Sequence, residues 1–248
     1  MIYAFSPEGV ARLSAVLATR PLLAFDIDGT LAPIVARPDA ARLPDEVQLG
    51  LAQLATRADV AIITGRSVGD ARRMLDFEPS YLIGNHGVEG LPEWRERAAM
   101  FAQTVQGWRD ALAACEALVA HGVVLENKRY SLSLHYRQAA NPSAAYRATR
   151  GCVDALDPVP KVIDGKAVVN LLPPGAPDKG EAMGVLMVTS RSSSAIYVGD
   201  DDTDETVFAL NLPNLLTLRV EPAADSRAAL FLRNQEEVLR LIRHIATH

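Results

Sequence analysis

Short apolar runs alternate with amphipathic stretches near both ends of the chain. Residues 22–25, 59–64 and 80–85 are mostly apolar, too short for a buried helix and suited to strands covered on both faces. Helical spacing of apolar positions lies between them, over 45–58 and 67–75. A further helix is expected from 179 onward, strands over 194–200 and 215–220, and a last helix over 234–245. This alternation predicts an α/β core with a doubly wound, mostly parallel sheet.

A different pattern occupies the middle of the chain. Residues 93–122 have helical spacing, whereas 123–137 alternate between apolar and polar, which predicts an antiparallel strand with one open face. A helix is expected over 144–157, and the Asp-Gly pair in 161–173 predicts the turn of a hairpin. We therefore expect a smaller α+β domain, 88–172, inserted into a core formed by 1–87 and 173–248.

Composition restricts the class of partner. Apolar residues make up 49% of the chain, charged residues 22%, and the net charge is −5, so no basic surface for nucleic acid or anionic membranes is expected. The N-terminal stretch predicts an amphipathic helix that begins near Ser6, rather than a secretion signal, which favours a cytoplasmic protein. We expect a small-molecule partner, no nucleic-acid or membrane partner, and a monomer or weak homo-oligomer.

The chain has two cysteines, Cys115 and Cys152. They lie far apart and form no C-x-x-C motif, so neither a zinc site nor a disulfide framework is indicated. The pattern predicts two buried free thiols.

Two acidic clusters follow predicted strands. Asp26 and Asp28 come directly after the run at 22–25, and "GDDDTDE" at 199–205 follows another apolar run. Because ligands of parallel sheets bind beyond the carboxyl ends of the strands, both clusters are expected to share one cleft. Facing carboxylates must be neutralised by a cation or a proton, and their hard oxygens suit Mg²⁺. Either motif alone has other interpretations, such as a helix cap, a glycosyltransferase metal motif or a solvated loop.

A magnesium site favours a phosphate substrate, since the ion stabilises phosphoryl oxygens. One aspartate of a D-x-D pair can attack phosphorus while the other transfers protons, which assigns these steps to Asp26 and Asp28. Thr64 ends a strand, and the amides of Gly65 and Arg66 follow it before a helix, where phosphate oxygens bind favourably. Lys179 can balance the negative charge.

The motifs "DIDGT" (26–30), Thr64, Lys179 and "GDDDTD" (199–204) occur in the order typical of the haloacid dehalogenase (HAD) superfamily of phosphatases, which the chain resembles. The resemblance implies that Asp26 is the nucleophile, that Asp28 is the acid/base and that Asp204 orients Lys179. It also implies a set of Mg²⁺ ligands: Asp26, Asp28 through its backbone carbonyl, Asp200, and Asp201 directly or through water.

Within that superfamily, "NHGVE", "ENKRYSLSLHYR", "DGKAVVN" and "GDDDTDETVF" are similar to trehalose-6-phosphate phosphatases. The implied reaction is hydrolysis of trehalose 6-phosphate to trehalose and phosphate through an aspartyl-phosphate, the last step of trehalose biosynthesis, with the inserted domain as a substrate-selecting cap. The expected substrate-binding residues, from the phosphate loop and from the motifs, are Gly65, Arg66, His86, Gly87, Glu89, Lys128, Lys166 and Asn170.

Asn170 stands where the family pattern has Glu, which keeps open another substrate, such as sucrose 6-phosphate or a related glycosyl phosphate. A non-catalytic sugar-phosphate sensor is a further alternative. A pure binding protein has little use for a nucleophile paired with a proton shuttle, so the complete set of motif residues favours an enzyme.

Overall fold

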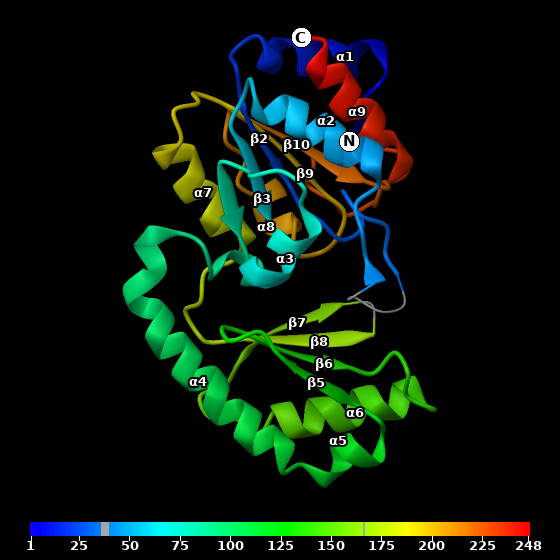
Figure 1. The fold of residues 1–248 in the computed structure, drawn as a ribbon. Coiled ribbons are helices and arrows are strands. Elements are labelled where there is room, and N and C mark those ends of the chain that lie inside the picture. Colours follow the sequence, from blue (N-terminus) through cyan, green and yellow to red (C-terminus); the bar gives the residue numbers. More distant parts are fainter. Residues whose placement is uncertain (36–39, 166) are drawn as a thin grey trace. The chain divides into compact units, whose positions relative to one another are not determined.

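The protein folds as two compact units in a computed structural model that describes residues 1–35, 40–165 and 167–248. The larger unit comprises Met1–Gly90 with Pro177–His248, and the smaller comprises Leu91–Ala176. Figure 1 shows the two units, which are described separately below. The expected boundaries, at 87/88 and 172/173, lie a few residues before those of the units.

The larger unit is built on a seven-stranded sheet in the order β1-β11-β10-β9-β2-β3-β4. Neighbouring strands are parallel throughout. The strands are β1 (Ile2–Tyr3), β2 (Leu22–Phe25), β3 (Val60–Ile63), β4 (Tyr81–Ile83), β9 (Ala195–Gly199), β10 (Leu215–Val220) and β11 (Leu230–Leu232). The central strands β2, β3 and β9 are buried at every position, which explains their continuous apolar sequences.

Helices cover both faces of this sheet. One face packs against α1 (Pro7–Leu17), α2 (Asp45–Ala55), α3 (Val68–Met74) and α9 (Glu236–Ala246), which share an apolar cluster with the strands. The helices α7 (Lys179–Thr189) and α8 (Glu205–Phe208) contact each other, and α8 packs Phe208 against Tyr197 of β9. The predicted doubly wound α/β class is confirmed, and Ser6 caps α1 as expected. The two-residue edge strand β1, the strand β11 and the one-turn helix α8 were not predicted.

The smaller unit contains a four-stranded antiparallel sheet in the order β5-β6-β8-β7. Its strands are β5 (Val124–Asn127), β6 (Leu132–His135), β7 (Lys161–Gly165) and β8 (Val168–Leu172). Its helices are η3 (Pro92–Trp94), α4 (Arg95–Ala113), α5 (Glu116–Ala120) and α6 (Pro142–Val153), and η2 (Asn85–Gly87) belongs to the larger unit. No helix in the described parts of the chain is both long and apolar enough to cross a membrane.

Two expectations for the smaller unit need correction. The single strand expected over 123–137 is a hairpin of β5 and β6, because the chain turns at Arg129, whose φ is positive. The hairpin of β7 and β8 forms as predicted, but Gly165 pairs with Val168, so the Asp-Gly pair lies within β7 and not in the turn. Leu132 and Leu134 enter the apolar cluster as the alternation predicts. The opposite face is not open as expected, because Ser133 is fully buried and its hydroxyl donates to the Asn170 side chain.

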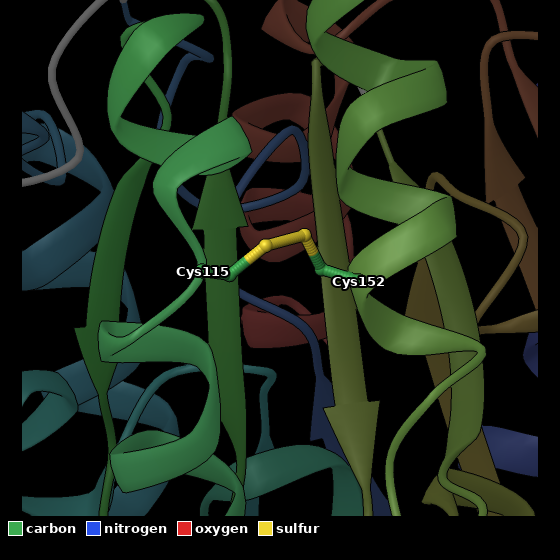
Figure 2. Close-up of a disulfide and its surroundings, with 2 residues drawn as sticks. All are labelled: Cys115 and Cys152. Carbon is green, nitrogen blue, oxygen red and sulfur yellow. A yellow bond between two sulfur atoms is a disulfide. The ribbon is translucent and has the colours of Figure 1, made fainter.

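A disulfide joins Cys115 and Cys152, so the prediction of two free thiols is wrong. Cys115 precedes α5 and Cys152 lies near the end of α6, and these two helices contact each other (Figure 2). A separation of 37 residues gives no local signal, because only helix packing brings the two sulfur atoms together. Disulfides are rare in cytoplasmic proteins, so this one counts against the expected cytoplasmic location. That location stays a prediction.

Reduction of the disulfide should destabilise the smaller unit. Opening a closed loop of this length restores conformational entropy to the unfolded chain, which corresponds to about 2–4 kcal/mol. Calorimetry with and without a reductant should therefore show a lower melting temperature for the reduced protein. The double variant Cys115→Ser/Cys152→Ser is the control, because its melting temperature should not respond to the reductant. Labelling of two thiols in the untreated, denatured protein would contradict the disulfide.

Candidate active site

The candidate site lies at one edge of the seven-stranded sheet, where three adjacent parallel strands end. Asp26 follows β2, Thr64 follows β3, and Asp200 follows β9. Because β9, β2 and β3 are neighbours with a common direction, their carboxyl ends meet at this edge. Residues far apart in the sequence are thus brought together as the sequence predicted.

A buried lysine links two of the acidic residues. The Lys179 Nζ lies 3.1 Å from Asp26 Oδ1 and 2.8 Å from Asp204 Oδ1, and the Lys179 side chain is only 2% exposed. Burial alone disfavours the ammonium, but Asp204 and Asp26 outweigh it and raise the pKa of Lys179 above its usual value. The lysine therefore stays charged inside the protein.

Asp204 has every oxygen engaged by the protein. Its Oδ1 accepts hydrogen bonds from Lys179 Nζ and from the Tyr197 hydroxyl at 2.6 Å. Its Oδ2 accepts bonds from the backbone amides of Asp200 and Asp201 at 2.8 and 3.0 Å. A carboxylate held in this way orients its neighbours and has little capacity left for a metal.

The acids form a group that suits a cation. One carboxylate oxygen from each of Asp26, Asp200 and Asp204 lies within 4.8 Å of the others. In the absence of a cation, burial raises the pKa of Asp26 well above its usual value, with Asp204 and Asp200 adding to the effect and Lys179 opposing it. Because Asp204 is saturated, Asp26 and Asp200 are the carboxylates that fit a hard divalent ion.

Gly29 allows the loop after β2 to approach Asp200. Its φ is +87°, and a Cβ there would lie 2.0 Å from Asp200 Oδ2, a distance that no side chain tolerates. The Thr30 hydroxyl donates to Asp200 Oδ1 at 3.4 Å. The two acidic segments are thus packed against each other.

Asp201 lies in the same loop but is held by its own neighbours. Its Oδ1 accepts hydrogen bonds from the Thr203 amide and hydroxyl, at 2.8 and 2.6 Å. Burial acts to raise the pKa of Asp201, but Lys179 and the Thr203 hydrogen bonds outweigh it, so the net shift is downward. Asp201 is not part of the three-carboxylate group, and its expected role as a ligand stays a prediction.

Arg66 binds the side chain of Asp28 with two parallel hydrogen bonds. The Arg66 Nε and Nη2 each donate to one Asp28 oxygen at 2.6 Å. Such a bidentate pair fixes the plane of a carboxylate. The sequence placed Arg66 near the phosphate but did not predict this pair, which joins the loops after β2 and β3.

The segments after β3 and β4 pack closely. Thr64 is fully buried, and its Oγ1 accepts a hydrogen bond from the Arg66 amide at 3.2 Å. A Cβ on Gly65 would lie 2.5 Å from the His86 ring, so Gly65 provides the space for that ring. Gly87, with φ of +119°, lies against the backbone of Asp178 in the same way. Gly65, His86 and Gly87, which were expected to bind substrate, therefore also pack these loops against each other and against Asp178.

Glu89 caps a helix in this structure. Its Oε2 accepts hydrogen bonds from the Val68 amide at the start of α3, at 2.9 Å, and from the Asn85 side chain, at 2.8 Å. Glu89 therefore has a structural role, and its expected role in sugar binding stays a prediction. Asn85 is fully buried and was not singled out from the sequence.

The smaller unit contains the other expected sugar-binding residues. Asn170 accepts a hydrogen bond from the Ser133 hydroxyl at 2.6 Å and donates to the Ile163 carbonyl at 3.4 Å. The Lys128 Nζ lies 3.8 Å from Glu126 Oε2. Lys166 falls outside the described residues.

The trehalose-phosphatase family model matches residues 24–228, which include both acidic clusters and the smaller unit. The chain belongs to the trehalose-phosphatase family. It is 35% identical over 207 residues to a trehalose-phosphate phosphatase of Mycolicibacterium paratuberculosis, and the match covers 76% of this chain and 50% of that protein. A trehalose-phosphate phosphatase of Mycobacterium marinum is 32% identical over 245 residues, with 90% of this chain and 60% of that protein covered. The chain thus spans about half the length of these curated relatives.

A solved structure shares the fold. The C-terminal domain of the Candida albicans trehalose-6-phosphate phosphatase superposes with a TM-score of 0.71 at 23% identity, covering 94% of this chain and 96% of that one. This likeness agrees with the HAD-type fold expected from the motifs. The sequence-based assignment to the family is confirmed.

Proposed function

We propose that the protein is a Mg²⁺-dependent phosphatase that hydrolyses trehalose 6-phosphate to trehalose and phosphate. The observation that carries the proposal is the buried chain of contacts from Asp26 through Lys179 to Asp204, at the strand ends where phosphate is expected to bind. Membership of the trehalose-phosphatase family supports the substrate.

In the proposed reaction an Asp26 oxygen attacks phosphorus and the bond from phosphorus to the sugar oxygen breaks. Asp28 gives its proton to the leaving sugar oxygen, and an aspartyl-phosphate remains on Asp26. Water then attacks this phosphorus, its proton goes to Asp28, and Asp26 is released. Arg66 donates to both oxygens of the Asp28 carboxylate and so fixes its orientation, and one of these oxygens must carry the proton that Asp28 gives in the first step.

The chain offers a donor set of hard oxygens for Mg²⁺. Asp26 and Asp200 would hold the ion by their carboxylates, Asp28 by its backbone carbonyl, and Asp201 directly or through water. The ion, when bound, supplies positive charge that stabilises the phosphoryl oxygens. Lys179 adds a second positive charge beside Asp26 and is itself kept in place by Asp204.

We propose that the smaller unit acts as the cap that selects the sugar. Asn170 lies on its sheet and Lys128 follows one of its strands, and both have polar groups that can bind hydroxyl groups. Lys166 is assigned the same role because it belongs to the motif "DGKAVVN". In the larger unit, Gly65, Arg66, His86, Gly87 and Glu89 would surround the phosphate and the adjoining sugar ring. We further propose a small-molecule substrate as the sole partner, a cytoplasmic location, and a monomer or weak homo-oligomer.

Phosphate release from a panel of sugar phosphates tests the proposed function. With Mg²⁺, trehalose 6-phosphate should be hydrolysed with the highest kcat/KM, and addition of EDTA should abolish the activity. Turnover of sucrose 6-phosphate or a glycosyl phosphate with no turnover of trehalose 6-phosphate would contradict the substrate. Binding of trehalose 6-phosphate without hydrolysis of any sugar phosphate would instead support the alternative of a non-catalytic sugar-phosphate sensor.

Sucrose 6-phosphate stays in the panel because of Asn170. Its side chain is neutral, and both of its polar groups bind within the sheet, to Ser133 and Ile163. A neutral amide forms a weaker hydrogen bond to a hydroxyl group than a carboxylate does, so the choice of sugar is left open at this position.

A further inference from the structure

Arg219, which has no part in the proposed chemistry, donates hydrogen bonds to the acidic segment 200–205 from a neighbouring strand. Arg219 lies on β10, the strand next to β9, and its register partner is Gly199, the residue just before the loop. Its side chain is only 12% exposed. The cation therefore lies inside the protein, beside the end of the central strand.

One nitrogen of Arg219 contacts both ends of this loop. Nη1 donates to the Asp201 carbonyl at 3.2 Å and to Glu205 Oε1 at 2.8 Å. The other oxygen of Glu205, Oε2, accepts a hydrogen bond from the Arg227 amide at 2.9 Å. The Arg219 Nε is buried, and within the described residues it has no hydrogen-bond partner. In the described parts of the chain, the hydrogen bonds of the guanidinium are therefore the two that Nη1 donates.

The loop needs such a contact because it is crowded with negative charge. Within six positions it has five acidic side chains, Asp200, Asp201, Asp202, Asp204 and Glu205. Repulsion between them favours an open loop, and an open loop would no longer hold the Asp200 carboxylate near Asp26. Asp204 and Thr203 fix the loop from within. Arg219 adds a positive charge from a neighbouring strand.

We propose that Arg219 is a positioning residue for the metal site: it keeps the 200–205 loop closed so that Asp200 is already in place when Mg²⁺ binds. The proposal rests on the proposed function for the identity of the ion. Arg219 touches neither the substrate nor the ion in this role, and it acts through the Asp201 carbonyl and Glu205.

The test measures Mg²⁺ binding without substrate. Arg219→Gln should weaken the Mg²⁺ affinity measured by calorimetric titration about 10-fold, the effect typical of residues that support metal ligands. Arg219→Lys keeps a cation within reach of Glu205 and should recover most of the affinity. The kcat at saturating Mg²⁺ and the KM for trehalose 6-phosphate should change less than about 3-fold, because the remaining residues are intact.

Two further variants complete the design. Arg227→Gln is the matched control, since Arg227 is exposed and binds Glu205 only through its backbone amide, so its Mg²⁺ affinity should equal that of the wild type. Glu205→Gln removes the partner charge and should reproduce the loss seen in Arg219→Gln. If Arg219→Gln fails to fold in EDTA, as judged by its melting curve, Arg219→Lys and Glu205→Gln decide the question.

Unchanged Mg²⁺ affinity in Arg219→Gln and in Glu205→Gln would overturn the proposal, as would a wild-type protein that binds no Mg²⁺. Failure of the proposed function has a different signature. In that case the wild type binds Mg²⁺, the Arg219 variants bind it more weakly, and trehalose 6-phosphate is not hydrolysed.

Discussion

Asp26→Asn should abolish hydrolysis of trehalose 6-phosphate, with a fall in kcat on the order of 10⁴-fold or more, as for the loss of other nucleophiles. The amide of Asn cannot attack phosphorus, although it has the shape of the carboxyl group. The loss should not come from unfolding, because the amide keeps the shape of the carboxyl group and Lys179 stays paired with Asp204. Steady-state phosphate release and the melting temperature of the variant separate the two effects.

Asp202→Asn is the matched control for this variant. Asp202 is exposed and lies in the same acidic loop, so the same chemical change should leave kcat within about 2-fold of the wild type. Retention of activity by Asp26→Asn would refute its role as nucleophile. Trapping of a phosphorylated Asp26 in the acid-quenched wild type, with none in the variant, would add direct support.

Lys179→Met should be the most destabilising single change at the site. It leaves Asp26 and Asp204 buried without their shared cation, and breaking a buried ion pair in this way costs about 3–5 kcal/mol. Methionine has a similar length, so the packing is largely kept and the charge effect dominates. Urea denaturation should give a lower free energy of unfolding, and activity should be lost as well.

Two comparisons isolate the charge effect. Lys161→Met, on the exposed side of β7, should change the free energy of unfolding by less than about 0.5 kcal/mol. The double variant Lys179→Met/Asp204→Asn should recover part of the loss, because it removes one of the unpaired charges. A Lys179→Met protein within 1 kcal/mol of the wild type would show that the buried lysine does not stabilise the cluster.

The sequence by itself determined most of the core and which acidic segments meet at one edge of the sheet. Strands buried on both faces must be apolar throughout, so β2, β3 and β9 were visible as short apolar runs. The alternation of β6 identified a strand, but its polar face is buried and not open as predicted. The acids of the site follow such strands directly. Their convergence was predictable because parallel neighbours end at the same edge of a sheet.

Local patterns failed where the deciding contact was not local. The hairpin of β5 and β6 has the alternation of one long strand, and its turn at Arg129 has no glycine to mark it. The edge strand β1 has only two residues, too few for any periodicity. Sequence patterns of this kind determine the type of an element better than its limits.

Only the tertiary structure decided how the site residues are partnered. The pair of Arg66 with Asp28, the saturation of Asp204 by Tyr197 and Lys179, and the bracing of the acidic loop by Arg219 join different segments of the chain. The disulfide is the same kind of case, since 37 residues separate its cysteines. Hydrogen bonds and sulfur bridges depend on distances of a few ångströms, and those distances arise from the packing of strands and helices that no single stretch of sequence specifies.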